Sequence, residues 1–146
     1  MRRSRAPAWR GLAALLLPSS PLLFVLVYYA HFGGVPHFFL HTLMGWDVAL
    51  LLLLTATCLG RPRTCWDGLL TLGLALYAMA PDFVYFSGPA HRDWMDVFLF
   101  HVALDEILPL ALPVLAVNWV LLLLAYARYR VETGQGDAAA SPTSRR

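Results

Sequence analysis

Four long apolar runs constrain this chain more than any other feature. They cover residues 11–30, 41–59, 68–85 and 108–127. Each is close to the roughly 20 residues that a helix needs to cross the hydrocarbon core of a bilayer. Hydrophobic residues make up 59% of the chain and charged residues 14%, whereas a soluble domain is nearer half apolar and a quarter charged. The sequence therefore predicts an all-α polytopic membrane protein, with a four-helix transmembrane domain over residues 1–130.

The first run contains a break. The segment PSSP occupies residues 18–21, and proline within a span is tolerated only where neighbours satisfy the freed backbone carbonyls. The span can therefore lie further toward the C-terminus, to include His31. An Arg-rich start before an apolar run is also typical of a secretory signal, but this run is long and no small-residue cleavage site follows it. These features favour an uncleaved first helix.

The arginines predict the orientation in the membrane. All eleven basic residues are arginines, and only Arg92 falls on the side of the predicted spans opposite to the other ten. Because basic residues collect in cytoplasmic loops, we expect both termini in the cytoplasm. All five histidines then lie at or near the extracytoplasmic face. The polar segment 131–146 is predicted to be a disordered cytoplasmic tail.

Charge and cysteine content exclude several classes of protein. A net charge of +2, with no basic stripe interleaved with aromatic residues, argues against a nucleic-acid partner. Two cysteines are too few for a disulfide framework. The partner that the composition does indicate is the lipid bilayer itself.

The segment PDFVYFSGPAHRDWMDVFLFHVALDE, residues 81–106, gathers ionisable side chains between two apolar runs. No helix breaker occurs from Asp93 until Pro109, which predicts a short helix lying on the outer surface before the fourth span. On such a helix His101 and Asp105 are four residues apart and share a face.

Histidines and carboxylates from several segments are predicted to meet at the outer face. Imidazole and carboxylate donors together suit a divalent metal such as zinc or manganese. A catalytic zinc needs three protein ligands and one open position. We interpret His31 and His37 as interfacial histidines. The predicted metal ligands are His41, Asp82 and His91, followed by Asp96, His101 and Asp105.

The order of short motifs resembles that of the bacterial membrane-bound metal-dependent hydrolases. HTLMG at residues 41–45 is similar to that family's His before a Gly at the start of a span, and APDF at 80–83 to its Pro-Asp motif. The pair His91–Arg92 is similar to the start of its His-Arg motif, although Asp96 stands where the family has a second His and Val84 where it has a second Asp. The resemblance implies a metal-dependent hydrolase acting on a lipid-linked or envelope substrate.

Two alternatives from other classes stay open. One is a small transporter subunit, in which the same groups line a pathway; below Asp47, which lies inside the second predicted span, that span offers only Thr55 and Thr57. The other is a non-catalytic membrane partner or assembly protein whose outer acids dock another subunit. A chain of this size would need to form an oligomer to make a pore.

Overall fold

The structure is a computed structural model that describes residues 13, 15–32, 34–61, 64, 66–85 and 93–140. Helices dominate this part of the chain and no strand occurs in it. The α-helices are α2 (Leu22–Phe32), α3 (Val35–Cys58), α4 (Trp66–Tyr85), α5 (His101–Glu106) and α6 (Leu108–Ala140). Two short 3-10 helices are η1 (Leu17–Ser19) and η2 (Asp93–Val97).

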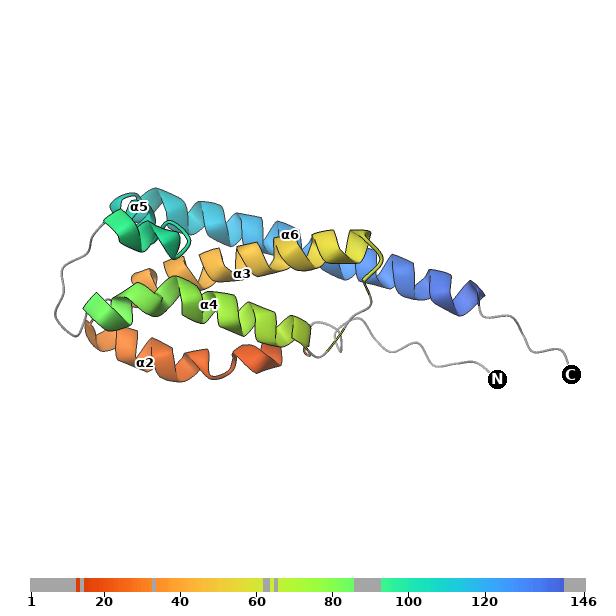
Figure 1. The fold of residues 1–146 in the computed structure, drawn as a ribbon, viewed down its shortest axis with the longest axis horizontal. Helices are drawn as coiled ribbons and strands as arrows, with labels where there is room; N and C mark the ends of the chain where they lie inside the picture. The colour runs from red at the N-terminus through yellow and green to blue at the C-terminus, as the bar shows by residue number, and fades with distance from the viewer. Residues whose placement is uncertain are drawn as a thin grey trace, which may run out of the picture.

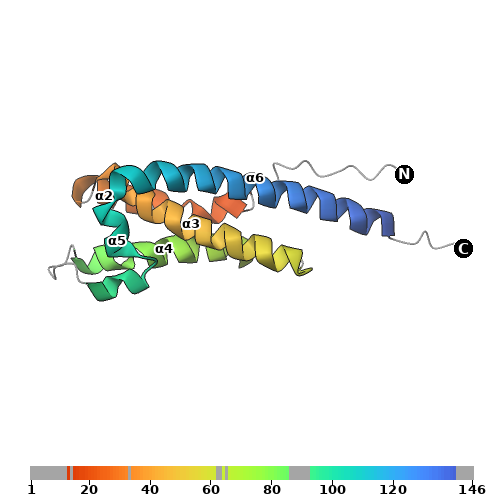
Figure 2. The same cartoon turned by 90° about the horizontal axis from the view of Figure 1, so that it is seen from above.

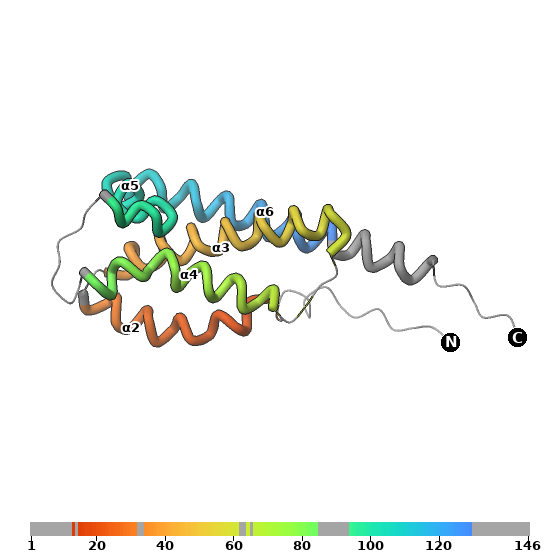
Figure 3. Tube along the Cα trace, viewed as in Figure 1, coloured from red at the N-terminus to blue at the C-terminus, as the bar shows by residue number. Residues whose placement is uncertain are grey.

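The helices form an elongated bundle with α3 at its centre (Figures 1 and 2). Helix α3 packs against α2, α4, α5 and α6. The trace in Figure 3 shows where the helix ends fall: the C-terminal ends of α2 and α4 lie with α5 and the N-terminal ends of α3 and α6. We call this the α5 end of the bundle. The opposite end carries the α3–α4 connection and the long extension of α6.

Three helices are long and apolar enough to cross a membrane. They are Val35–Cys58 and the stretches Trp66–Val84 and Leu108–Tyr129 of α4 and α6. This finding supports the prediction of an all-α polytopic membrane protein. The first predicted span is not such a helix, because the chain breaks into η1 and α2 around the two prolines at 18 and 21. Helix α2 has 11 residues, about 17 Å, roughly half of a bilayer core.

The chain between the third and fourth predicted spans also differs from expectation. The predicted single surface helix is divided into η2 and α5, and α5 packs against α3, α4 and α6. Leu99 and Phe100 separate the two pieces, both with φ near +60° (58° and 59°). At the other end of the chain, α6 continues to Ala140, into the segment predicted to be disordered. Alanines at 138–140 are strong helix formers and favour this extension.

Close approach of α3 and α4 depends on Gly45. A Cβ atom at this position would lie 2.5 Å from the carbonyl oxygen of Leu74 and 2.6 Å from the Cα of Ala75. Those distances are too short for any side chain, so only glycine permits this helix crossing. Gly45 lies one turn beyond His41 and meets the middle of α4, so the crossing fixes how closely α3 and α4 pack next to His41.

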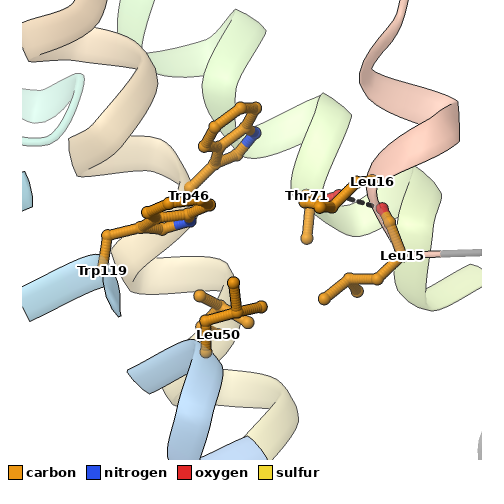
Figure 4. Close-up of a pocket in the computed structure, with 7 residues that line it drawn as sticks. Leu15, Leu16, Trp46, Leu50, Thr71 and Trp119 are labelled. Carbon is orange, nitrogen blue, oxygen red and sulfur yellow. Dashed lines mark hydrogen bonds between the residues drawn. The ribbon is translucent and has the colours of Figure 1, made fainter. Parts of the chain in front are cut away.

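Away from the α5 end, aromatic and aliphatic side chains fill the bundle. Trp46 of α3 and Trp119 of α6 stack with ring centroids 5.6 Å apart (Figure 4). Leu50 lies beside them, and across the bundle the hydroxyl oxygen of Thr71 lies 3.5 Å from the backbone carbonyl oxygen of Leu15. The hydroxyl hydrogen is donated to the nearer carbonyl of Gly68 at 2.7 Å.

Candidate metal centre

Three imidazoles and two carboxylates converge at the α5 end. One ligand atom from each of four residues lies within 4.8 Å of the corresponding atom of the others, and the carboxylate of Asp82 borders the same nitrogens. The four residues are His37, His41, His101 and Asp105. We call them, with Asp82, the His/Asp cluster. They come from α3, α4 and α5, so tertiary packing alone assembles them.

Helix α3 contributes two histidines from consecutive turns. Before α3 the chain turns at Gly34, whose φ of 86° favours glycine and whose N–H donates to the carbonyl of Tyr29 at 2.7 Å. Pro36 then lies in the first turn of α3, where a missing N–H costs nothing. This turn places His37 against Tyr29, with ring centroids 5.7 Å apart. The Nε2 atoms of His37 and His41 are 3.1 Å apart.

Helix α4 contributes Asp82. Its Oδ1 lies 3.1 Å from the Nε2 of His101 and 3.2 Å from the Nε2 of His37. The Tyr29 hydroxyl donates a short hydrogen bond to its Oδ2. Asp82 is fully buried, and a buried carboxylate is costly unless it is paired in this way.

Helix α5 contributes His101 and Asp105. The left-handed residues Leu99 and Phe100 turn the chain inward immediately before His101, which is fully buried. Non-glycine residues in this conformation are strained and occur where the surrounding structure fixes them. Asp96 helps to hold this turn in place: its Oδ1 accepts hydrogen bonds from the N–H groups of Val102 and Ala103 at 2.8 and 3.0 Å. The carboxylate therefore caps the start of α5.

The orientation of the His101 ring is set by the backbone of α4. Its Nδ1 donates to the carbonyl oxygen of Ala78 at 3.1 Å. Pro81, in the next turn, carries no N–H, so its position in α4 interrupts the helical hydrogen bonding in this region. A histidine that donates one ring N–H to a backbone carbonyl presents the bare nitrogen of the other side to a metal. The Nδ1 of His41 has no such partner among the described residues.

The spacing of donor atoms matches a compact coordination shell. Zinc–nitrogen and zinc–oxygen bonds of about 2.0–2.1 Å give ligand–ligand separations of about 3.3 Å in a tetrahedron. The Nε2 of His41 lies 3.0 Å from the Asp105 Oδ1, and the Nε2 of His37 lies 3.7 Å from the same oxygen. With the 3.1 Å separation of the two α3 nitrogens, these three separations lie near the tetrahedral edge, and the four donor atoms together lie within 4.8 Å of one another. The donor set also fits manganese.

The two carboxylates of the cluster favour a bound proton or cation between the side chains. With its Nδ1 proton donated to Ala78, a neutral His101 has a bare Nε2, which lies 3.1 Å from Asp82 and 3.8 Å from Asp105. A lone pair facing two carboxylates is repulsive unless a proton or a cation lies between them. A divalent cation would offset both carboxylate charges at once.

The cluster is buried on one side and open on the other. His41, Asp82 and His101 have no exposed surface. The side chains of His37 and Asp105 are 17% and 22% exposed. Within the cluster, only His37 and Asp105 are accessible from outside the bundle.

Four of the six predicted ligands meet in the cluster: His41, Asp82, His101 and Asp105. Asp96 instead caps α5, and His91 lies outside the described residues. His37 was predicted to be an interfacial histidine, but the structure places it in the cluster. Its spacing of four residues from His41 is the sequence signal that could have identified it.

Asp47 is a buried acid that lies outside the cluster. Asp47 is 5% exposed, and its Oδ2 accepts a hydrogen bond from the amide nitrogen of Asn118 at 2.9 Å. Asp47 faces α6, whereas His41 and the cluster face α4 and α5. It is therefore not part of the candidate metal centre.

Fold and site together define a helical membrane protein with a buried His/Asp cluster able to hold a metal ion. Comparisons with protein-family models, with curated proteins and with solved structures found no match to this chain.

Proposed function

We propose that the chain is a membrane-embedded hydrolase that uses a divalent metal ion, zinc or manganese, held by His37, His41, His101 and Asp105. One observation carries the proposal: donor atoms from two helices lie within 4.8 Å of one another at one end of an apolar bundle. A polar cluster of this kind within a membrane protein is costly and is typically retained for function.

The residues of the cluster divide into binding and proton-handling roles. A bound divalent cation supplies Lewis-acid polarisation of a carbonyl or phosphoryl oxygen and a nucleophile at neutral pH. The Ala78 carbonyl orients His101, and Asp105 lies at the open edge. Asp82 keeps its Oδ2 against the Tyr29 hydroxyl, which leaves Oδ1 beside two imidazole nitrogens. We assign Asp82 Oδ1 the role of proton acceptor.

The position of the cluster supports a lipid-linked or envelope substrate. We propose that residues 15–32, of which η1 packs against α4 and α2 against α3, act as the first of four spans although η1 interrupts them. Both termini then lie in the cytoplasm of a bacterium, and the cluster opens at the extracytoplasmic side of the inner membrane. The partial exposure of His37 and Asp105 gives a headgroup access from that side.

The motif resemblance supports hydrolysis over other uses of a metal. His41 with Gly45 and Pro81 with Asp82 are the two resembling elements that lie within the described residues. His41 and Asp82 both belong to the cluster, and Gly45 sets the helix crossing beside it.

The experiment that tests the proposal is the metal content of the detergent-purified protein, measured by mass spectrometry. We expect about one zinc or manganese per chain, lost in His41→Ala and His101→Ala. His31→Ala is the matched control, because His31 is exposed and contacts the carbonyl of its own helix residue Val27. A folded wild-type protein without metal would contradict the metal centre.

Hydrolysis is tested separately, in vesicles of phosphatidylglycerol. We expect metal-loaded wild-type protein to release fatty acid or a phosphorylated headgroup, and His101→Ala to release neither. Stoichiometric metal without any turnover of lipid or added lipid-linked saccharide would instead support the non-catalytic alternative, a metal-binding assembly partner.

A further inference from the structure

Helix α6 is the least covered of the three membrane-length helices. In the most apolar 18-residue stretch of each helix, 6% of the residues are fully buried in α6, against 56% in α3 and 44% in α4. It packs on α3 along its length and on α5 at one end. Figures 1 and 2 show it at the edge of the bundle. Eleven of the 22 residues from Leu108 to Tyr129 are exposed, so about half of the circumference of α6 faces whatever surrounds the monomer in the membrane.

One exposed face of α6 carries a polar residue. Val114, Asn118, Leu121 and Ala125 are all exposed, and their spacing of four, three and four residues puts them on one stripe of the helix. This spacing is that of alternating d and a positions in a heptad. Asn118 then occupies an a position, with Val114 and Leu121 at d positions on either side.

Asn118 lies near the middle of the apolar stretch Leu108–Tyr129, about 15 Å from each end. Within the described part of the chain its side chain makes one hydrogen bond, from Nδ2 to the Oδ2 of Asp47. The amide has a second N–H and a carbonyl oxygen with no partner among those residues. At this depth no water replaces them, and an unsatisfied polar group in hydrocarbon costs several kcal/mol.

We propose that this face of α6 is a homodimer interface, in which the Asn118 side chains of two copies pair with each other. Two copies inserted with the same orientation form a parallel helix pair, so each a position faces the same a position of the second copy. A carboxamide is self-complementary, because it has both donor and acceptor. Each Nδ2 keeps one hydrogen on its own Asp47 and donates the other to the second copy's Asn118 carbonyl.

The chemistry of Asn118 favours a second copy over lipid as the occupant of this face. Lipid chains satisfy Val114 and Leu121 equally well, but they offer no donor or acceptor to an amide. Small Ala125 lets two backbones approach closely one turn beyond Leu121. The Asp47 contact also holds Asn118 in place before association, which reduces the side-chain entropy lost on pairing.

Disulfide cross-linking in lipid vesicles tests the interface. In a background lacking both native cysteines (Cys58→Ser with Cys65→Ser), we expect Val114→Cys and Leu121→Cys to give disulfide-linked dimers on oxidation. Val120→Cys is the matched control, because Val120 is 46% exposed but lies on the other side of α6 from Asn118. Equal cross-linking at Val120 and Val114 would overturn the proposal.

A second measurement uses the dimer fraction in vesicles, from stepwise photobleaching of singly labelled chains. We expect Asn118→Val to weaken dimerisation about tenfold, the size of an interhelical polar contact in a membrane. Ala125→Trp removes no contact within the monomer and should also abolish the dimer. Metal content should stay unchanged in Ala125→Trp. A monomeric wild-type protein, or dimers that survive both substitutions, would refute the interface without bearing on the metal centre.

Discussion

The Nε2 atoms of His37 and His41 lie 3.1 Å apart on consecutive turns of α3. At this separation two bare nitrogens repel each other and two protonated nitrogens clash. One proton shared between them resolves the conflict, and so does a metal ion bound to both. The Asp105 Oδ1, 3.0 Å from the His41 nitrogen, adds a negative charge that a metal ion offsets better than one shared proton.

Removal of the metal should therefore destabilise the protein. We expect a chelator to lower the thermal midpoint of the wild-type protein, because a ligand at a hundredfold excess over its Kd contributes about 2.7 kcal/mol to the folded state. Readdition of zinc or manganese should restore the midpoint. The measurement is thermal unfolding in detergent, with His101→Ala as the variant that should not respond. An identical midpoint with and without chelator in the metal-loaded wild type would contradict this expectation.

The crossing at Gly45 predicts an effect on the site from a residue that does not touch it. Gly45→Ala places a Cβ 2.5 Å from the Leu74 carbonyl oxygen, which forces α3 and α4 apart at a cost of about 1–3 kcal/mol. The Ala78 carbonyl of α4, which orients His101, then moves relative to His41 of α3, and metal affinity should fall. Gly73→Ala is the control, because a Cβ there meets no atom within 4 Å. Equal metal affinity in the two variants would show that the crossing does not position the cluster.

The sequence predicts the location of the cluster better than its members. Charge asymmetry of the loops assigns all histidines to one end of the spans, and the structure gathers His37, His41 and His101 there. Spacing within one helix also indicates which residues share a face. Spacing cannot show how α5 sits against α3 and α4, because that depends on the strained turn at Leu99 and Phe100, which no local pattern predicts.

The same limit applies to the fold. Apolar length identifies α3, α4 and α6, because a membrane-length helix needs only enough consecutive apolar residues. The break at residues 18–21 is visible as two prolines, but whether neighbours satisfy the freed carbonyls is a tertiary property. Asp96 shows the same limit: it lies five residues before His101, so its capping of α5 depends on the turn at Leu99 and Phe100 that divides the predicted helix.

The Tyr29 hydroxyl should affect the metal affinity of the cluster, because it holds the Asp82 carboxylate. Tyr29→Phe removes the hydroxyl that donates to the Asp82 Oδ2 and leaves the ring packing against His37 and Phe38 in place. Loss of a hydrogen bond to a metal ligand typically weakens metal affinity 10- to 100-fold. Tyr29 bonds Asp82, which borders the ligands His37 and His101, so we expect a loss at the lower end of that range. Isothermal titration with zinc measures the change. Tyr28→Phe is the control, since Tyr28 is 38% exposed on the same helix, and an equal loss in both variants would exclude a specific role for the Tyr29 hydroxyl.

Two variants of Asp96 distinguish a capping role of this residue from a role as a metal ligand. Asp96→Asn keeps a side-chain oxygen able to accept the N–H groups of Val102 and Ala103, so it should preserve both α5 and the metal. Asp96→Ala loses the cap, which typically costs about 0.5–2 kcal/mol, and should lower the thermal midpoint and weaken metal binding through displacement of His101. Metal content and thermal unfolding of the two variants check this expectation. If Asp96→Asn loses its metal while its thermal midpoint, measured with chelator present, equals that of the wild type, Asp96 is a ligand after all.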